Sequence, residues 1–144
     1  MEISGNRVFD APQSAVWEKL LDPAAIRRAI PGCEAMDATG PDTYDLTIKV
    51  GIAAIKGTYS GTVEVRDQKP EESYRLVVSG SGKPGSVQGD ALLSLSEQDG
   101  KTTVTYQGDV KAQGVIARMG SRLLGGAAKL LIGQFMDGME KQLG

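Results

Sequence analysis

The sequence predicts an α+β fold in which a strongly curved antiparallel sheet of about seven strands wraps around a long C-terminal helix. Three observations lead to this fold class. Residues 115–143 form the only long stretch with sustained helical periodicity. Residues 44–112 alternate apolar and polar side chains with a period of two, which is typical of long strands. The 19 glycines, set against two phenylalanines and one tryptophan, suggest a curved backbone that encloses interior space.

The N-terminal part of the chain is expected to form short elements. These are a strand over 2–9, short helices over 11–21 and 24–29, and a short strand over 33–37. Asp22-Pro23 ends the first helix and starts the second. Pro31-Gly32 then breaks the second helix and turns the chain. The whole of 1–144 is expected to be one domain, since this length is enough to bury a core.

The central part of the chain predicts a meander of antiparallel strands with one apolar and one polar face. Tight turns are expected at 68–70 and 98–100. The apolar face collects Tyr44, Leu46, Ile48 and Val50, then Tyr59, Gly61, Val63 and Val65, then Tyr74, Leu76 and Val78, then Val87, Gly89, Ala91, Leu93 and Leu95, and finally Val104, Tyr106, Gly108, Val110 and Ala112.

The C-terminal helix is amphipathic, and its predicted apolar face has a shallow centre line of small or polar residues. Arg118, Arg122 and Lys129 form the opposite, solvated stripe. The apolar face collects Ile116, Met119, Gly120, Leu123, Leu124, Ala127, Leu130, Leu131, Gln134, Phe135 and Gly138. A second apolar stripe consists of Ala128, Ile132, Met136, Met139 and Leu143. The C-terminal half of the helix is therefore expected to contact two different surfaces, one on each apolar stripe.

Composition excludes several classes of function. The net charge of −2 gives no basic excess for binding nucleic acid. The absence of histidine removes histidine-based triads, general bases and metal ligands. The single cysteine, Cys33, excludes an internal disulfide and a cysteine metal cluster. The carboxylates fall in turns or on outward positions, such as Glu64 and Asp90, so no catalytic residue, metal or cofactor is predicted.

The expected location is the cytoplasm, with peripheral contact at the inner face of the cell membrane as an open alternative. Residues 2–7 lack the features of a signal peptide. Charged residues interrupt the C-terminal helix, so we do not expect it to span a membrane.

The predicted order of elements is that of the helix-grip fold of START-like (SRPBCC, Bet v 1-like) ligand carriers. Five segments sharpen the resemblance: 21–23 (LDP), 30–34 (IPGCE), 50–51 (VG), 56–61 (KGTYSG) and 120–123 (GSRL). Together they resemble the CoxG family, the G-subunit family of carbon monoxide dehydrogenase, along the whole chain. The resemblance implies a non-catalytic accessory protein of a molybdenum hydroxylase such as carbon monoxide dehydrogenase. It also implies attachment of that enzyme to the membrane and binding of a quinone in an apolar cavity.

A cavity between the sheet and the helix is the predicted ligand site. Inward glycines at 61, 89 and 108 either leave space there or only relieve strain where the sheet bends. The amide of Gln134, or the hydroxyls of Tyr59 and Tyr106, are candidate donors to a ligand carbonyl; Gln134 can instead be a buried amide bonded to backbone. The predicted lining is Ile48, Val50, Tyr59, Gly61, Val63, Leu76, Val78, Leu93, Tyr106, Gly120, Leu123, Ala127, Leu131 and Gln134.

Two surfaces are candidates for contact with other molecules. The apolar connection Ile52, Ala53, Ala54 and Ile55 is either a lip that touches lipid or a flap that closes the cavity mouth. The second helix stripe, Ile132, Met136, Met139 and Leu143, either docks a partner protein or a second copy, or is covered by the two short helices.

The function favoured by the sequence is a non-enzymatic carrier of an apolar ligand, with a quinone suspected from the resemblance. One rival is a polyketide cyclase-like enzyme in which Tyr59 or Tyr106 is the acid. The other is an assembly factor that acts through its surface, with an incidental cavity.

Overall fold

A computed structural model of the protein describes residues 1–52 and 55–143. In chain order its elements are β1 (Glu2–Phe9), α1 (Gln13–Leu21), α2 (Pro23–Ala29), β2 (Cys33–Gly40), β3 (Thr43–Val50), β4 (Gly57–Lys69), β5 (Ser73–Gly82), β6 (Gly85–Gln98), β7 (Lys101–Gln113), the 3₁₀ helix η2 (Val115–Met119) and α3 (Gly120–Leu143). The predicted order of a strand, two short helices, six strands and a long helix is confirmed.

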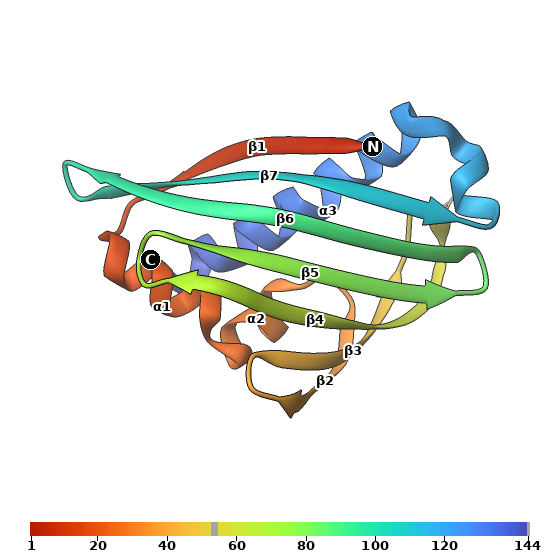
Figure 1. The fold of residues 1–144 in the computed structure, drawn as a ribbon, viewed down its shortest axis with the longest axis horizontal. Coiled ribbons are helices and arrows are strands. Elements are labelled where there is room, and N and C mark those ends of the chain that lie inside the picture. Colours follow the sequence, from red (N-terminus) through yellow and green to blue (C-terminus); the bar gives the residue numbers. More distant parts are fainter. Residues whose placement is uncertain (53–54, 144) are drawn as a thin grey trace.

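The seven strands form one antiparallel sheet in the order β1-β7-β6-β5-β4-β3-β2. The strands from β2 to β7 each pair with their neighbour in sequence, and β1 closes the other edge by pairing with β7. Figure 1 shows α3 running along one face of this curved sheet, with α1 and α2 gathered at one end. The opposite face of the sheet carries the alternate, mostly polar residues of each strand.

The buried core is concentrated at the end of the molecule that holds α1, α2 and the C-terminal half of α3. Phe9, Val16 and Met139 have no exposed surface there. Trp17 and Tyr74 meet edge to face with ring centroids 5.6 Å apart, an arrangement that aromatic rings prefer. The cluster is completed by Ala11, Leu20, Ala25, Ile26, Ala29, Val65, Leu93, Leu95, Val104 and Met136.

The junction of α1 and α2 follows from the sequence Asp22-Pro23. The Asp22 carboxylate accepts a hydrogen bond from the Ala24 amide at 3.1 Å and so caps α2. Pro23 stands in the first turn, where its missing N–H costs nothing. The two helices therefore turn against each other and cover the end of α3.

The C-terminal helical stretch is divided, whereas the periodicity predicted one continuous helix. Gly120 has φ of +82°, a left-handed conformation that glycine adopts without steric cost, and it separates η2 from α3. The buried face of α3 is also displaced by roughly a quarter turn from the predicted one. Met136 and Met139 of the second stripe lie at its centre, because α1 and α2 pack against that side.

Candidate functional site

The candidate site is the open end of the concave sheet face, opposite the end filled by the core. Along each central strand the inward residues change from buried to half-buried towards this end, as from Tyr74 to Leu76 and Val78 in β5. Apolar side chains therefore remain partly uncovered between the sheet and the N-terminal half of α3. On the strands, the half-buried members of the predicted lining are Ile48, Val50, Tyr59, Gly61, Val63, Leu76, Val78 and Tyr106.

The reason for this open end is the direction of α3. The backbone of α3 comes closest to α1, α2, η2 and β1. It thus follows the β1 edge of the sheet and leaves the inner faces of β3, β4 and β5 less covered (Figure 1). The sequence predicted these inward residues correctly, because the period-two pattern assigns each strand residue to a face.

The inward glycines at 61 and 108 allow the sheet to bend. A Cβ atom at Gly61 would overlap the carbonyl oxygen of Ser79 on β5. A Cβ atom at Gly108 would lie 2.5 Å from the carbonyl oxygen of Asp90 on β6. Backbone approaches this close are possible only at glycine, so bending of the sheet accounts for both residues. At Gly89 the methyl group of Val78 occupies the space, 2.9 Å from where a Cβ would stand.

Tyr59 and Tyr106, the two candidate donors on the inner face, both contact other parts of the protein. The Tyr59 hydroxyl donates a hydrogen bond of 2.6 Å to the carbonyl oxygen of Ile55. Burial raises the pKa of this hydroxyl. The Tyr106 ring lies against Gly5 of β1, its cross-strand partner, where any side chain would collide with the phenol. The Tyr59 hydroxyl is therefore already used within the protein, and the Tyr106 phenol is packed against β1.

The connection between β3 and β4 turns inward at its C-terminal end. Ile55 is buried and Ile52 is half-buried, and the Ile55 amide donates to the Ile52 carbonyl at 3.0 Å. The burial of Ile55 favours the flap alternative over the lipid-touching lip at this residue. Ala53 and Ala54 lie outside the described residues, so the prediction of a lipid-touching lip stays a prediction for them.

Several α3 residues in the predicted lining point elsewhere. Leu123 is 61% exposed, and Gln134 is exposed too, so neither projects between the helix and the sheet. Gly120 is exposed at the start of the helix. Ala127 and Leu131 are half-buried at the edge of the covered face, and Leu93 of β6 is buried in the core cluster. The buried-amide alternative for Gln134 is wrong for the same reason, since its side chain is on the solvent side.

The second stripe of α3 is not a docking surface. Met136 and Met139 are 4% and 0% exposed, and Ile132 and Leu143 pack against the same cluster. A Cβ atom at Gly138 would stand 2.8 Å from the Cα atom of Ala29, so α2 and α3 are in close contact. The short helices cover this stripe, which was the alternative to a partner surface.

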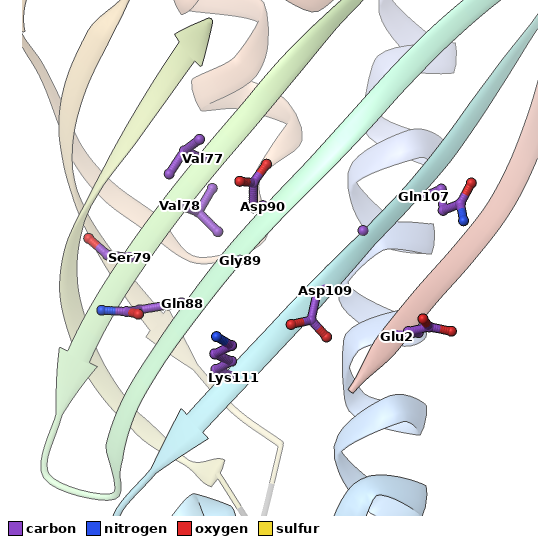
Figure 2. Close-up of a pocket in the computed structure, with 11 residues that line it drawn as sticks. Glu2, Val77, Val78, Ser79, Gln88, Gly89, Asp90, Gln107, Asp109 and Lys111 are labelled. Carbon is purple, nitrogen blue, oxygen red and sulfur yellow. The ribbon is translucent and has the colours of Figure 1, made fainter.

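Two hollows in the described part of the chain lie outside the predicted cavity. One, of about 700 Å³, is on the outer face of the sheet among polar residues of β1, β5, β6 and β7. Figure 2 shows Asp90, Asp109, Gln88, Gln107 and Glu2 around it, with α3 on the far side of the strands. The second, of about 660 Å³, lies between the start of β1 and α3. The period-two pattern placed the outer residues on one face but carries no information about where that face is hollow.

The charged groups of the outer face pair with one another. Arg75 bonds Asp90 in the outer hollow and also reaches Asp67, and these bonds raise the pKa of its guanidinium. The hydrogen bond from Arg66 lowers the pKa of the Glu64 carboxyl. These pairs are exposed, so they add little to folding stability. The bond from Arg66 favours the ionised form of the Glu64 carboxyl.

Solved structures with the same architecture define the fold class. A START superfamily protein from Mycobacterium smegmatis superposes with a TM-score of 0.78 at 10% identity, over 99% of this chain and 96% of that one. The structure of Ara h 8.0201 gives a TM-score of 0.70 at 13% identity, over 99% and 97%. These likenesses show the fold: the protein has a START-like, Bet v 1-like helix-grip architecture.

The family follows from the sequence model of the carbon monoxide dehydrogenase G-subunit (CoxG), which matches residues 5–144. The chain belongs to this family. A conserved protein from Geobacillus kaustophilus has a crystal structure that superposes with a TM-score of 0.97 at 36% identity, over 99% of this chain and 95% of that one. No curated protein matches the chain significantly. The family and the fold are consistent with an accessory ligand-binding protein. No helix in the described part of the chain is long and apolar enough to cross a membrane.

Proposed function

We propose that the protein is a non-catalytic accessory protein of a molybdenum hydroxylase, of the carbon monoxide dehydrogenase type, that carries an apolar ligand and links the enzyme to the membrane. The ligand class is a quinone, held between the open end of the sheet and the N-terminal half of α3. The observation that carries this proposal is a row of half-buried apolar side chains on the inner faces of β3, β4 and β5. At the core end of the same sheet, the inward side chains are buried.

The energetics of such a site favour a flat or chain-like apolar molecule. Each Å² of apolar surface removed from water contributes roughly 25 cal/mol, so a few hundred Å² of ligand contact contributes several kcal/mol. Ile48, Val63 and Val78 offer surface of this kind on three adjacent strands. Ile55, tethered to Tyr59, is placed to cover the ligand.

The chemistry of the inner face supports a carrier over an enzyme. A tyrosine acid must donate its proton to the substrate, whereas the Tyr59 hydroxyl already donates to a backbone carbonyl. Burial makes that hydroxyl a weaker acid, because it disfavours the phenolate. The Tyr59 hydroxyl is therefore poorly suited to be the proton donor that the polyketide cyclase-like alternative requires.

The experiment is organic extraction of the purified protein after incubation with bacterial membranes, followed by mass spectrometry. We expect a quinone in near-stoichiometric amount. Val63→Trp enlarges a half-buried inward residue of β4 and should reduce recovery at least fivefold.

The matched control is Leu92→Trp, which enlarges an exposed residue on the outer face of β6 and should leave recovery unchanged. Circular dichroism and thermal melting establish that both variants fold. A protein that is recovered empty and takes up no added quinone would overturn the proposal. Equal recovery from wild type and Val63→Trp would move the ligand away from the open end.

A further inference from the structure

The outward side of α3 carries an apolar stripe that no other residue in 1–52 or 55–143 covers. Leu123 and Leu130 are 61% and 50% exposed, although both are large apolar residues. They alternate with Gly126 and Gly133 at spacings of three and four residues, the spacing of a helix–helix contact seam. We call Leu123, Gly126, Leu130 and Gly133 the outer stripe. It lies roughly opposite the buried face centred on Met136 and Met139.

The two glycines of the outer stripe face open space. Apart from the adjoining turns of α3, no described residue lies within 4 Å of the position that a Cβ atom would take at Gly126 or at Gly133. Gly138, in the same helix, differs because Ala29 of α2 fills that position. A glycine inside a helix costs about 1 kcal/mol relative to alanine, so two of them in open space weaken α3 without an internal benefit. Glycines on a helix surface allow another backbone to approach closely.

A cationic border runs along one side of the outer stripe. Arg122 and Lys129 are exposed, and neither forms an ion pair with another described residue. They border the hollow of about 660 Å³ beside the start of β1, and Gly125 and Gly126 contribute to its wall. A carboxylate-bearing side chain entering this hollow would meet both cations, with Glu2 as the only acidic residue among those that line it.

We propose that the outer stripe docks a helix of a partner protein that has a small-residue or apolar contact face bordered by carboxylates. Leu123 and Leu130 would pack beside that helix, Gly126 and Gly133 would let the two backbones approach, and Arg122 and Lys129 would pair with its carboxylates. This surface lies outside the ligand site and extends beyond the proposed carrier function.

The composition of the stripe favours a protein helix over the other candidates. Bulky apolar and aromatic residues strengthen the binding of a helix to a lipid surface, whereas glycine adds no apolar contact area. In an antiparallel pair formed with a second copy of the chain, Arg122 and Lys129 of one copy would face Arg122 and Lys129 of the other. These like charges would repel. A partner helix that carries carboxylates can approach closely at the glycines and can also form ion pairs with Arg122 and Lys129.

The test is photo-crosslinking in cells that produce the protein, with benzoylphenylalanine replacing Leu130, and with mass spectrometry to identify the crosslinked peptide. The control position is Leu92, which is similarly exposed on the outer face of the sheet. We expect position 130, and not position 92, to crosslink one protein at a helical segment with Asp or Glu along one side. Gly126→Leu, or the charge reversal Arg122→Glu with Lys129→Glu, should reduce the yield at least tenfold.

Quinone recovery from these variants separates this proposal from the proposed function, since the outer stripe lies outside the ligand site and recovery should stay at the wild-type level. Crosslinks to lipid, together with tighter binding of Gly126→Leu to vesicles of 30% phosphatidylglycerol in phosphatidylcholine, would overturn the proposal in favour of a membrane surface. Crosslinks only to the chain itself would overturn it in favour of a second copy. An absence of position-specific crosslinks would also overturn it.

Discussion

At the scale of single residues, the glycines divide into those that the fold requires and those that it tolerates. Gly61→Ala should lower the free energy of unfolding by about 3 kcal/mol, because the new methyl group would overlap the Ser79 carbonyl and force β4 away from β5. The measurement is urea denaturation followed by circular dichroism. Gly40→Ala is the control, since nothing lies within 4 Å of its Cβ position. A Gly61→Ala variant as stable as the control would contradict this account of the bend.

Two glycines of α3 make a matched pair with opposite expected effects. Gly138→Ala should destabilise the protein by about 1–3 kcal/mol, since its Cβ would press on Ala29. Gly133→Ala should stabilise it by about 0.8 kcal/mol through helix propensity alone, because its Cβ meets open space. Thermal melting of both variants, at equal protein concentration, measures the difference. Changes of the same sign would show that α2 does not contact α3 at Gly138.

Tyr74 makes stability depend on pH in the alkaline range. Burial raises the pKa of its hydroxyl above the ordinary value of 10.0, so the folded protein keeps the proton after the unfolded chain has lost it. The stabilisation is therefore complete below pH 10 and is lost as the pH rises above it. Relative to wild type, Tyr74→Phe should gain about 1.4 kcal/mol of stability between pH 8 and pH 11. Denaturation at both pH values tests this, with Tyr44→Phe as the control; an equal decline in wild type and Tyr74→Phe would contradict it.

At the scale of elements, the strands were predictable and the orientation of the helix was not. A strand residue points to one of two faces, so a period of two assigns Val63 or Val78 to the inner face from sequence alone. A helix residue can point in any direction, and α3 has apolar residues around most of its circumference. The sequence therefore predicted that α3 has two apolar sides, but its contacts with α1 and α2 decide which side is buried. For this reason Leu123 and Gln134 were assigned to the site. Met136 and Met139 were left with two alternatives, a partner surface or a face covered by the two short helices.

Ile55, at the C-terminal end of the connection between β3 and β4, is held by a hydrogen bond from the Tyr59 side chain. Tyr59→Phe removes the hydrogen bond to the Ile55 carbonyl and leaves the ring in place. A hydrogen bond of this kind contributes about 1 kcal/mol, so amide exchange at Ile55 should become about fivefold faster. Hydrogen exchange followed by NMR measures it, with the Val104 amide as an internal reference. Unchanged exchange at Ile55 would mean that its burial, and not the tether, holds the connection.

At the scale of the whole molecule, the core is polarised along the strands. Phe9, Val104 and Met139 define a fully buried end, whereas Val50, Val63 and Val78 mark an end that stays partly uncovered. Hydrogen exchange should therefore be slowest around Thr102–Val104 and faster along β3 and the far half of β4. Added quinone should slow exchange in the second region by at least tenfold and leave the first unchanged. Uniform exchange along the strands, or slowing at the core end, would contradict a ligand at the open end.

The pairing of the two most distant strands has a consequence for how the chain folds. Glu2 on β1 is opposite Asp109 on β7, so this pair joins segments more than a hundred residues apart, whereas every other strand pair joins neighbours in sequence. Forming the distant pair has a larger loop-closure entropy cost than forming a hairpin. During synthesis, β1 leaves the ribosome long before its partner exists. The meander from β2 to β7 can assemble progressively, and the docking of β1 is then a late step that completes the sheet.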